Sequence, residues 1–181
     1  MELLYAILII LVLICLLAII YIFYYNRIQD IKLKIDEAES IIDENLRIKY
    51  DLIVDIKNII NDKIKNNKIT FKDLEVLKNE KISNFTLDRR LNEYMDLIDK
   101  VKNDYSSIDK NDDINQKLEE LYLIDEKITS AKTYYNKYIT ESNTLVRRFP
   151  SNIVAKFHNV EIKNFFDNKD MNDEEVNDFK L

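Results

Sequence analysis

The chain has no glycine and no tryptophan, and only one proline, one cysteine and one histidine among its 181 residues. The lack of glycine excludes glycine-rich phosphate loops and removes the main turn former of β-sandwiches, barrels and Rossmann sheets. One histidine and one cysteine, Cys15 in an apolar run, cannot build a cluster of soft metal ligands and do not suggest a Ser-His-Asp or Cys-His nucleophile. With 46% hydrophobic and 33% charged residues, the composition instead predicts a single all-α domain.

A long apolar run occupies the N-terminal end of the chain. Residues 3–25 carry no charge and no strong helix breaker, and as a helix they cover about 34 Å against a hydrocarbon core of about 30 Å. We therefore expect residues 1–26 to form a transmembrane anchor whose residues 3–25 contact the lipid bilayer. Two alternatives are disfavoured. A cleaved signal peptide needs basic residues before a shorter apolar run, whereas only Met1 and Glu2 precede this one. A lipoprotein signal ending at Cys15 needs a small residue at the position that Ile14 occupies.

The residues at the end of this run predict the orientation of the protein in the membrane. Three tyrosines fit an aromatic belt at the interface: Tyr21, Tyr24 and Tyr25. Cationic side chains follow the run, whereas the opposite end offers only the α-amino group: Arg27, Lys32 and Lys34. The positive-inside rule therefore predicts a single-pass protein of the cell membrane, N-out and C-in, with the large domain in the cytoplasm.

An apolar stripe with helical spacing continues directly after the membrane segment. Its members recur at intervals of mostly three and four residues: Ile28, Ile31, Ile35, Ala38, Ile42, Leu46, Ile53, Ile56, Ile60 and Ile64. The pattern predicts that one helix runs from the membrane to about Lys65. Asn66 and Asn67 are the expected stop, because Asn is the best remaining left-handed residue in a chain without glycine.

Three further helices are predicted after this stop. A short one covers about residues 71–80, and another begins with Thr86 as N-cap and carries the stripe Leu87, Leu91, Tyr94, Ile98 and Val101. A second long helix opens in the acidic segment 109–113 and ends at Pro150. Its predicted inward residues are Ile114, Leu118, Leu121, Ile128, Ala131, Tyr135, Leu145 and Phe149.

Amphipathic helices of this kind can bury their stripes only against each other. We therefore predict an all-α fold in which a single N-terminal transmembrane helix continues into an antiparallel helical bundle, with two long and two or more short helices. Residues 27–166 form this helical domain. Residues 167–181 contain six acidic residues against two lysines, and we expect them to form a disordered acidic tail.

Several short motifs of the chain resemble those of the LemA family of bacterial membrane proteins. The most specific ones are YN at residues 25–26, KYDLI at 49–53, YN at 135–136, FPSNIVA at 149–155 and FF at 165–166. His158-Asn159 stands where the family has a glycine-containing turn. The resemblance implies one membrane anchor and a helical domain dominated by two long antiparallel helices, and it implies no reaction.

Two candidate metal sites are rejected. Asp109, Asn111, Asp113 and Glu120 have the spacing of an EF-hand loop, but position 6 must turn sharply and is occupied by the β-branched Ile114. The single His158 has no ligand cluster around it in the sequence. We expect no catalytic residue, no metal and no cofactor, and hence no enzyme.

The segment after the second long helix is the candidate partner surface, comprising Phe149, Pro150, Ser151, Asn152 and Phe157. Ser151 or Asn152 can cap a new short helix whose Ile153, Val154 and Phe157 face inward. This segment can serve as a structural cap of the bundle or as a docking surface for another protein. Asn136 and Asn143 share a helix face and are expected to hydrogen-bond across the bundle.

Two functions from different classes fit these features. The first is a membrane-tethered scaffold or interaction protein, whose partners we expect to be other membrane proteins of the bacterial envelope. The alternative is a signal-transmitting or ligand-sensing bundle, which needs a pocket or a buried polar cluster, and the sequence indicates neither. The net charge of −6 argues against nucleic acid as a partner, and no small-molecule substrate is indicated.

Overall fold

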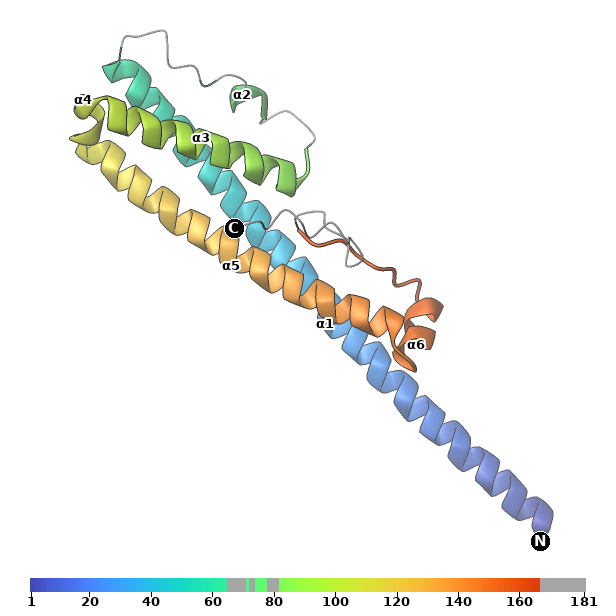
Figure 1. The fold of residues 1–181 in the computed structure, drawn as a ribbon. Helices are drawn as coiled ribbons and strands as arrows, with labels where there is room; N and C mark the ends of the chain where they lie inside the picture. Colours follow the sequence, from blue (N-terminus) through green and yellow to red (C-terminus); the bar gives the residue numbers. More distant parts are fainter. Residues whose placement is uncertain (65–70, 72–73, 78–81, 167–181) are drawn as a thin grey trace, which may run out of the picture. The chain divides into compact units, whose positions relative to one another are not determined.

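The computed structural model describes residues 1–64, 71, 74–77 and 82–166, and the structural statements below concern these residues. They form α-helices and connections without a strand, which confirms the all-α prediction. The helices are α1 (Glu2–Lys63), α2 (Leu74–Leu77), α3 (Asn84–Asp104), α4 (Ser106–Asp109), α5 (Asp112–Arg147) and α6 (Ser151–Phe157) (Figure 1). The predicted stop at Asn66 and Asn67 and the predicted tail at 167–181 lie outside the described residues.

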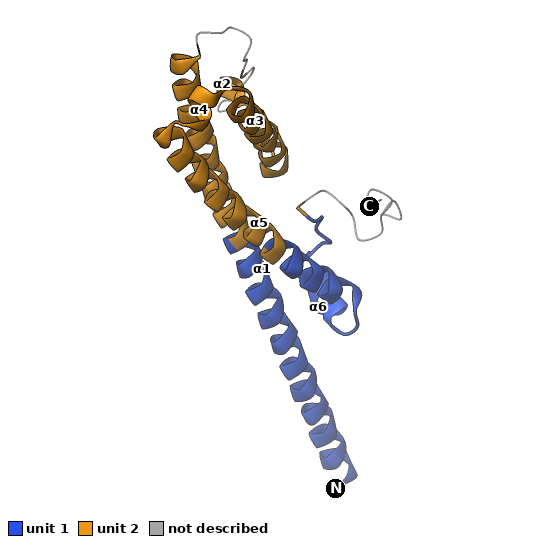
Figure 2. Ribbon diagram, turned by 60° about the vertical axis from the view of Figure 1, so that its left-hand side comes forward, with its two compact units in different colours: residues 1–37, 135–165, 169–181 blue, residues 38–134, 166–168 orange. Residues whose placement is uncertain are grey.

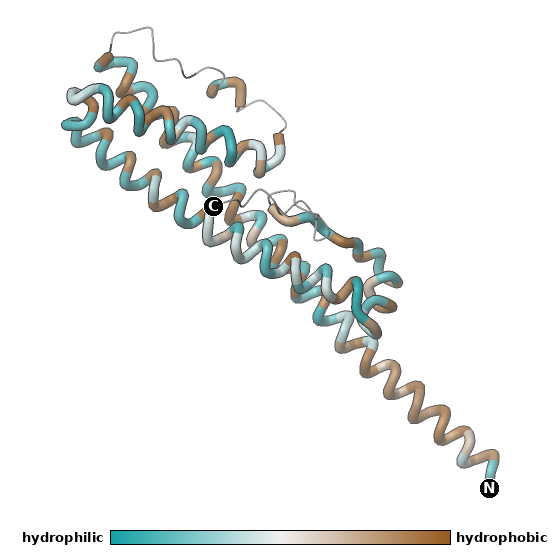
Figure 3. Tube along the Cα trace, viewed as in Figure 1, coloured by the Kyte–Doolittle hydropathy of each residue, from teal (hydrophilic) through white to brown (hydrophobic). Residues whose placement is uncertain are grey.

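Helix α1 is a single helix of 62 residues, as the continuous stripe predicts. Glu2 in its first turn and Lys63 in its last turn have the charges that the helix dipole favours at each end. Its N-terminal part is hydrophobic along almost its whole length (Figure 3), and the most apolar stretch of 18 residues in it is 0% buried. By length and composition it is the one helix in the described ranges that is able to cross a membrane.

The chain divides into two compact units, and α1 and α5 contribute residues to both (Figure 2). Unit 1 contains residues 1–37 and 135–165. In it, Val154 and Ala155 of α6 pack with Ile28 of α1. Arg27 pairs with Glu141 at 2.6 Å, and the Lys34 ammonium lies 5.0 Å from the Tyr138 ring centre. From Arg27 to Lys34 the residue number on α1 rises, while from Glu141 to Tyr138 the number of the contacted residue on α5 falls. The two helices are therefore antiparallel in this unit.

Unit 2 contains the described residues between 38 and 134, together with Phe166. Lys49 of α1 pairs with Asp125 of α5, and Asp55 pairs with Lys117 at 2.7 Å, so α1 and α5 are antiparallel here as well. The core combines apolar side chains of α1, α3 and α5 that are 7% exposed or less: Ala38, Ile42, Leu46, Leu52, Ile53, Ile56, Ile60, Leu91, Ile98, Val101, Ile114, Leu118, Leu121, Ile124, Ile128 and Ala131. Most of the residues predicted to face inward on these three helices are therefore confirmed as buried.

The predicted starts of the shorter helices need correction. Ser83, not Thr86, is the N-cap of α3, because the Ser83 hydroxyl oxygen accepts a hydrogen bond from the Thr86 backbone N–H at 3.2 Å. An additional helical turn, α4, lies before α5. The Asn111 side chain then accepts a hydrogen bond from the Ile114 backbone N–H at 3.0 Å, and α5 contains Asp113 and Glu120, two of the four residues that a calcium loop would need.

Candidate functional site

The candidate partner surface lies in unit 1, in the corner formed by residues 149–157. Phe149 and Phe157 are 80% and 76% exposed, whereas Ser151 is buried and Pro150 and Asn152 are half-buried. The five predicted residues therefore do not form one exposed surface. Ser151 instead closes the end of α5, because its hydroxyl oxygen lies 2.8 Å from the carbonyl oxygens of both Leu145 and Arg148.

The predicted inward orientation of Phe149, Ile153 and Phe157 is wrong. Helix α6 has only seven residues and buries one narrow face, which consists of Ser151, Val154 and Ala155. Ile153 is 60% exposed, and it lies on the same outward face of α6 as Phe157, because residues four apart share one face of a helix. The corner thus presents three large apolar side chains that are each at least 60% exposed.

The end of α6 explains how the chain manages without a glycine at this turn. Asn159 has φ 52°, in the left-handed region. The backbone N–H of Val160 donates to the Ala155 carbonyl at 2.9 Å, and that of Asn159 donates to the Lys156 carbonyl at 3.2 Å. This is the Schellman pattern that glycine usually closes. Asn159 therefore takes the left-handed position that a glycine usually occupies at such a helix end.

Aromatic side chains join the corner to the end of the apolar segment of α1. The rings of Phe157 and Tyr21 meet edge to face with centroids 6.4 Å apart. The His158 ring nitrogen Nε2 lies 2.7 Å from the Tyr21 hydroxyl oxygen, and its ring centroid is 4.9 Å from that of Tyr25. The single histidine is therefore placed as a structural contact between the corner and α1.

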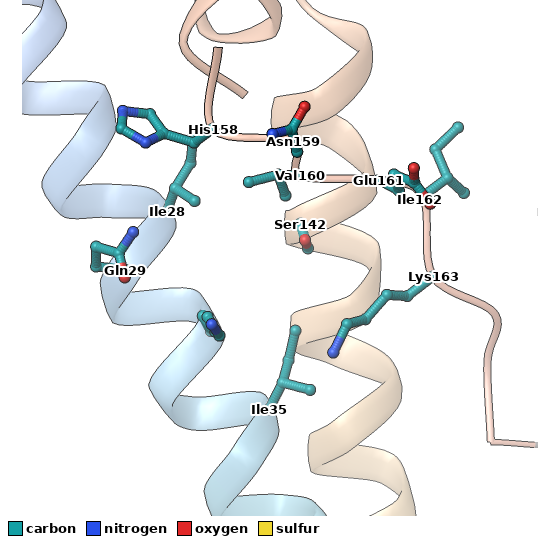
Figure 4. A pocket seen from close by; sticks show the side chains of 11 residues that line it. Ile28, Gln29, Ile35, Ser142, His158, Asn159, Val160, Glu161, Ile162 and Lys163 are labelled. Atoms are coloured by element: carbon teal, nitrogen blue, oxygen red, sulfur yellow. The ribbon is translucent and has the colours of Figure 1, made fainter. Parts of the chain in front are cut away.

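A cavity of about 440 Å³ lies beside this contact in unit 1 (Figure 4). It is bounded by α1, α5 and the segment that follows α6: Ile28, Gln29, Lys32, Ile35, Ser142, His158, Asn159, Val160, Glu161, Ile162 and Lys163. Asn143 holds this segment, since its amide group exchanges two hydrogen bonds with the Lys163 backbone at 2.8 and 2.9 Å. These two bonds join α5 to the extended chain and are not the bonds across the bundle that were predicted for Asn143. The same prediction for Asn136 stays a prediction.

A buried ionic cluster lies in unit 2, centred on Lys49. The Lys49 side chain is 0% exposed, and its Nζ lies 2.5 Å from both the Asn92 and Asp125 side-chain oxygens. Asp88, 5% exposed, lies 3.7 Å from Lys49 through Oδ1 and accepts a 2.7 Å hydrogen bond from Lys132 through Oδ2. We refer to Lys49, Asp88, Asn92, Asp125 and Lys132 as the Lys49 cluster.

The Lys49 cluster is a buried polar cluster of the kind that the sequence analysis did not indicate. Asp88 Oδ1 is buried and makes no hydrogen bond, so the carboxylate depends on the two ammonium groups for its charge balance. A signal was present in the sequence. Lys49 lies three residues after Leu46 and four before Ile53, which is an inward position of the α1 stripe.

Outer polar pairs attach the remaining elements of unit 2. A hydrogen bond from Lys57 lowers the pKa of the Glu75 carboxyl and ties α2 to α1. Partial burial and a hydrogen bond to Asp99 raise the pKa of Tyr122 to about 12, and this bond ties α5 to α3. Burial likewise raises the pKa of Tyr50, beside the negative Asp51.

Comparison with known proteins gives one positive finding. The model of the LemA family matches residues 38–179 of the chain. The matched range begins after the apolar segment and covers most of the helical domain, including the Lys49 cluster and the corner. No curated protein and no solved structure matches the chain.

Proposed function

Because the chain belongs to the LemA family, a family of membrane proteins, we propose that it is a membrane-anchored, non-enzymatic scaffold or interaction protein of the bacterial cell envelope. Its partners are other membrane proteins. In this proposal residues 3–25 cross the bilayer once, and the helical domain stands in the cytoplasm. The chemistry of the protein is recognition rather than reaction.

The continuity of α1 is the observation that carries this proposal. The same helix is exposed and apolar at its N-terminal end and becomes a core helix from Ile28 to Ile60, with a buried residue at almost every turn. Helix α1 is not interrupted where the apolar segment ends, so no loop separates the anchor from the helical residues of unit 1 that follow it.

Site-specific photo-crosslinking in native membranes tests the scaffold function. A photo-reactive residue at Leu123, which is 54% exposed on α5, is expected to give adducts with a defined set of membrane proteins. The same residue at Leu121, which is 0% exposed on the same helix, serves as the matched control and is expected to react only within the chain. If exposed positions along α3 and α5 give no adduct with another protein while the domain remains folded, the scaffold proposal is rejected.

The orientation is tested by protease protection. Arg27, Lys32 and Lys34 follow the apolar segment, so residues 27–181 are expected to be protected when protease is added to intact spheroplasts. They should be digested once the membrane is permeabilised. Digestion in intact spheroplasts, with a cytoplasmic marker protein preserved, would reverse the proposed orientation.

The Lys49 cluster favours signal transmission as a second candidate function. A bundle that senses a ligand or a partner needs polar groups with more than one possible pairing, and Lys49 lies within 4 Å of two carboxylates. Helix α1 carries Lys49 and also the apolar segment, so a change of pairing could be passed along one helix. This candidate takes precedence if crosslinking finds no partner.

A further inference from the structure

The corner of unit 1 exposes apolar side chains in an unusual amount. Phe149, Ile153 and Phe157 are 80%, 60% and 76% exposed, while the opposite face of α6 packs on α1 and α5 through Val154 and Ala155. A single exposed apolar residue needs no explanation, but three large ones within nine residues form a patch that usually has a partner.

The position of this patch indicates its partner. Phe157 contacts Tyr21, and His158 contacts Tyr21 and Tyr25, which are both within the last two turns of the apolar segment 3–25. The exposed apolar surface of α1 therefore continues onto α6 without an intervening polar element. Helix α5 is antiparallel to α1, so its C-terminal end leads the chain back to this same level of α1 (Figures 1 and 2).

The charge of this segment differs from that of the rest of the chain. Residues 142–160 contain Arg147, Arg148 and Lys156 and no aspartate or glutamate, although the chain as a whole has a net charge of −6. Arg148 and Lys156 are exposed. Basic side chains next to exposed aromatic and aliphatic ones are typical of helices that lie in the interface of an anionic membrane.

We propose that the corner is a second membrane contact. Helix α6 lies along the headgroup region of the bilayer that residues 3–25 cross, with Phe149, Ile153 and Phe157 among the upper acyl chains and Arg148 and Lys156 at the phosphates. This inference rests on the proposed membrane span of residues 3–25. It assigns the corner to lipid, and a protein partner at the same surface becomes an outcome of the test.

The absence of tryptophan makes a direct test possible, because each introduced tryptophan is the sole reporter. The full chain is reconstituted in vesicles of phosphatidylcholine and phosphatidylglycerol that carry bromine either near the headgroup end or near the terminus of the acyl chains. The reporters are Phe157→Trp and, in case that change disturbs the Tyr21 contact, Phe149→Trp. Ile14→Trp reports on the membrane span and Leu123→Trp on an exposed site of unit 2, with circular dichroism as the folding control.

The proposal predicts blue-shifted emission and about a twofold loss of fluorescence for F157W and F149W with shallow bromines, and less quenching with deep bromines. I14W should be quenched most by deep bromines, and L123W by neither. If I14W is quenched while both corner reporters emit as in water, the corner is not a membrane contact. If they are blue-shifted but not quenched, the corner is buried against protein, in the same chain or in a second copy of it, and the proposal is overturned. If I14W itself is not quenched, the membrane span fails, and this inference fails with it.

Discussion

Replacement of Lys49 by methionine is expected to destabilise the helical domain by about 3–5 kcal/mol, because it removes the buried ammonium that pairs with Asp125 and leaves Lys132 to balance the charge of the buried Asp88. Methionine occupies a volume similar to that of lysine, so the loss reflects charge rather than a cavity. Asp88 is the side chain most affected, since its Oδ1 is buried without a hydrogen bond. For a chain of this size the midpoint of thermal unfolding should fall by roughly 6–20 °C, measured by far-UV circular dichroism in detergent.

Lys127→Met is the matched control for this experiment. Lys127 lies on the exposed face of α5, and its replacement should change the free energy of unfolding by no more than about 0.5 kcal/mol. Asp125→Ala should cost less than Lys49→Met, because the Asp125 side chain is 36% exposed and Lys49 would retain Asp88 and Asn92. A Lys49→Met variant as stable as the Lys127→Met variant would show that the Lys49 cluster does not hold the domain together.

Replacement of Ile53 by alanine is the second change with a large expected effect. Ile53 is 0% exposed and lies in the core of unit 2, so the loss of its side chain should cost about 2–5 kcal/mol from transfer and cavity terms. That amount is a large part of the stability of a typical domain, which is about 5–15 kcal/mol. The measurement is the midpoint of thermal unfolding of the full chain in detergent, followed by far-UV circular dichroism.

Ile48→Ala provides the comparison on the same helix. Ile48 is 36% exposed, so the same chemical change should have a clearly smaller effect on the midpoint. Equal effects of the two changes would mean that Ile53 does not contribute the core contact that its burial indicates. Loss of partner capture in Ile53→Ala, together with its retention in Ile48→Ala, would show that capture requires the folded domain.

The helices of this protein could be predicted because burial repeats along them at helical spacing. The stripe from Ile28 to Ile60 can be predicted without knowledge of the tertiary structure, because a spacing of three or four residues keeps successive side chains on the same face of the helix. The N-cap of α3 was predicted wrongly as Thr86, because Ser83 and Thr86 both carry a hydroxyl and only the packed helix decides which one begins it.

The Lys49 cluster and the outward face of α6 could not be obtained in the same way. The stripe was followed through apolar residues alone, so the inward lysine between Leu46 and Ile53 was passed over. For α6, a helix of two turns with apolar residues on both faces has no periodicity that selects the buried one. The contact of Val154 and Ala155 with Ile28 makes that selection, and it depends on where α5 ends.

The contacts of α6 also fix the rotational phase of α1 where it leaves the apolar segment. Tyr21 lies on one side of the boundary at Asn26 and Ile28 on the other, and the α6 region contacts both. One residue inserted at this boundary would turn the two sides by about 100° and separate them by about 1.5 Å. The α6 region could then keep its contact with Tyr21 or with Ile28, but not with both. The contacts of α6 thus permit only one rotation of the apolar segment, about the axis of α1, relative to the residues that follow it.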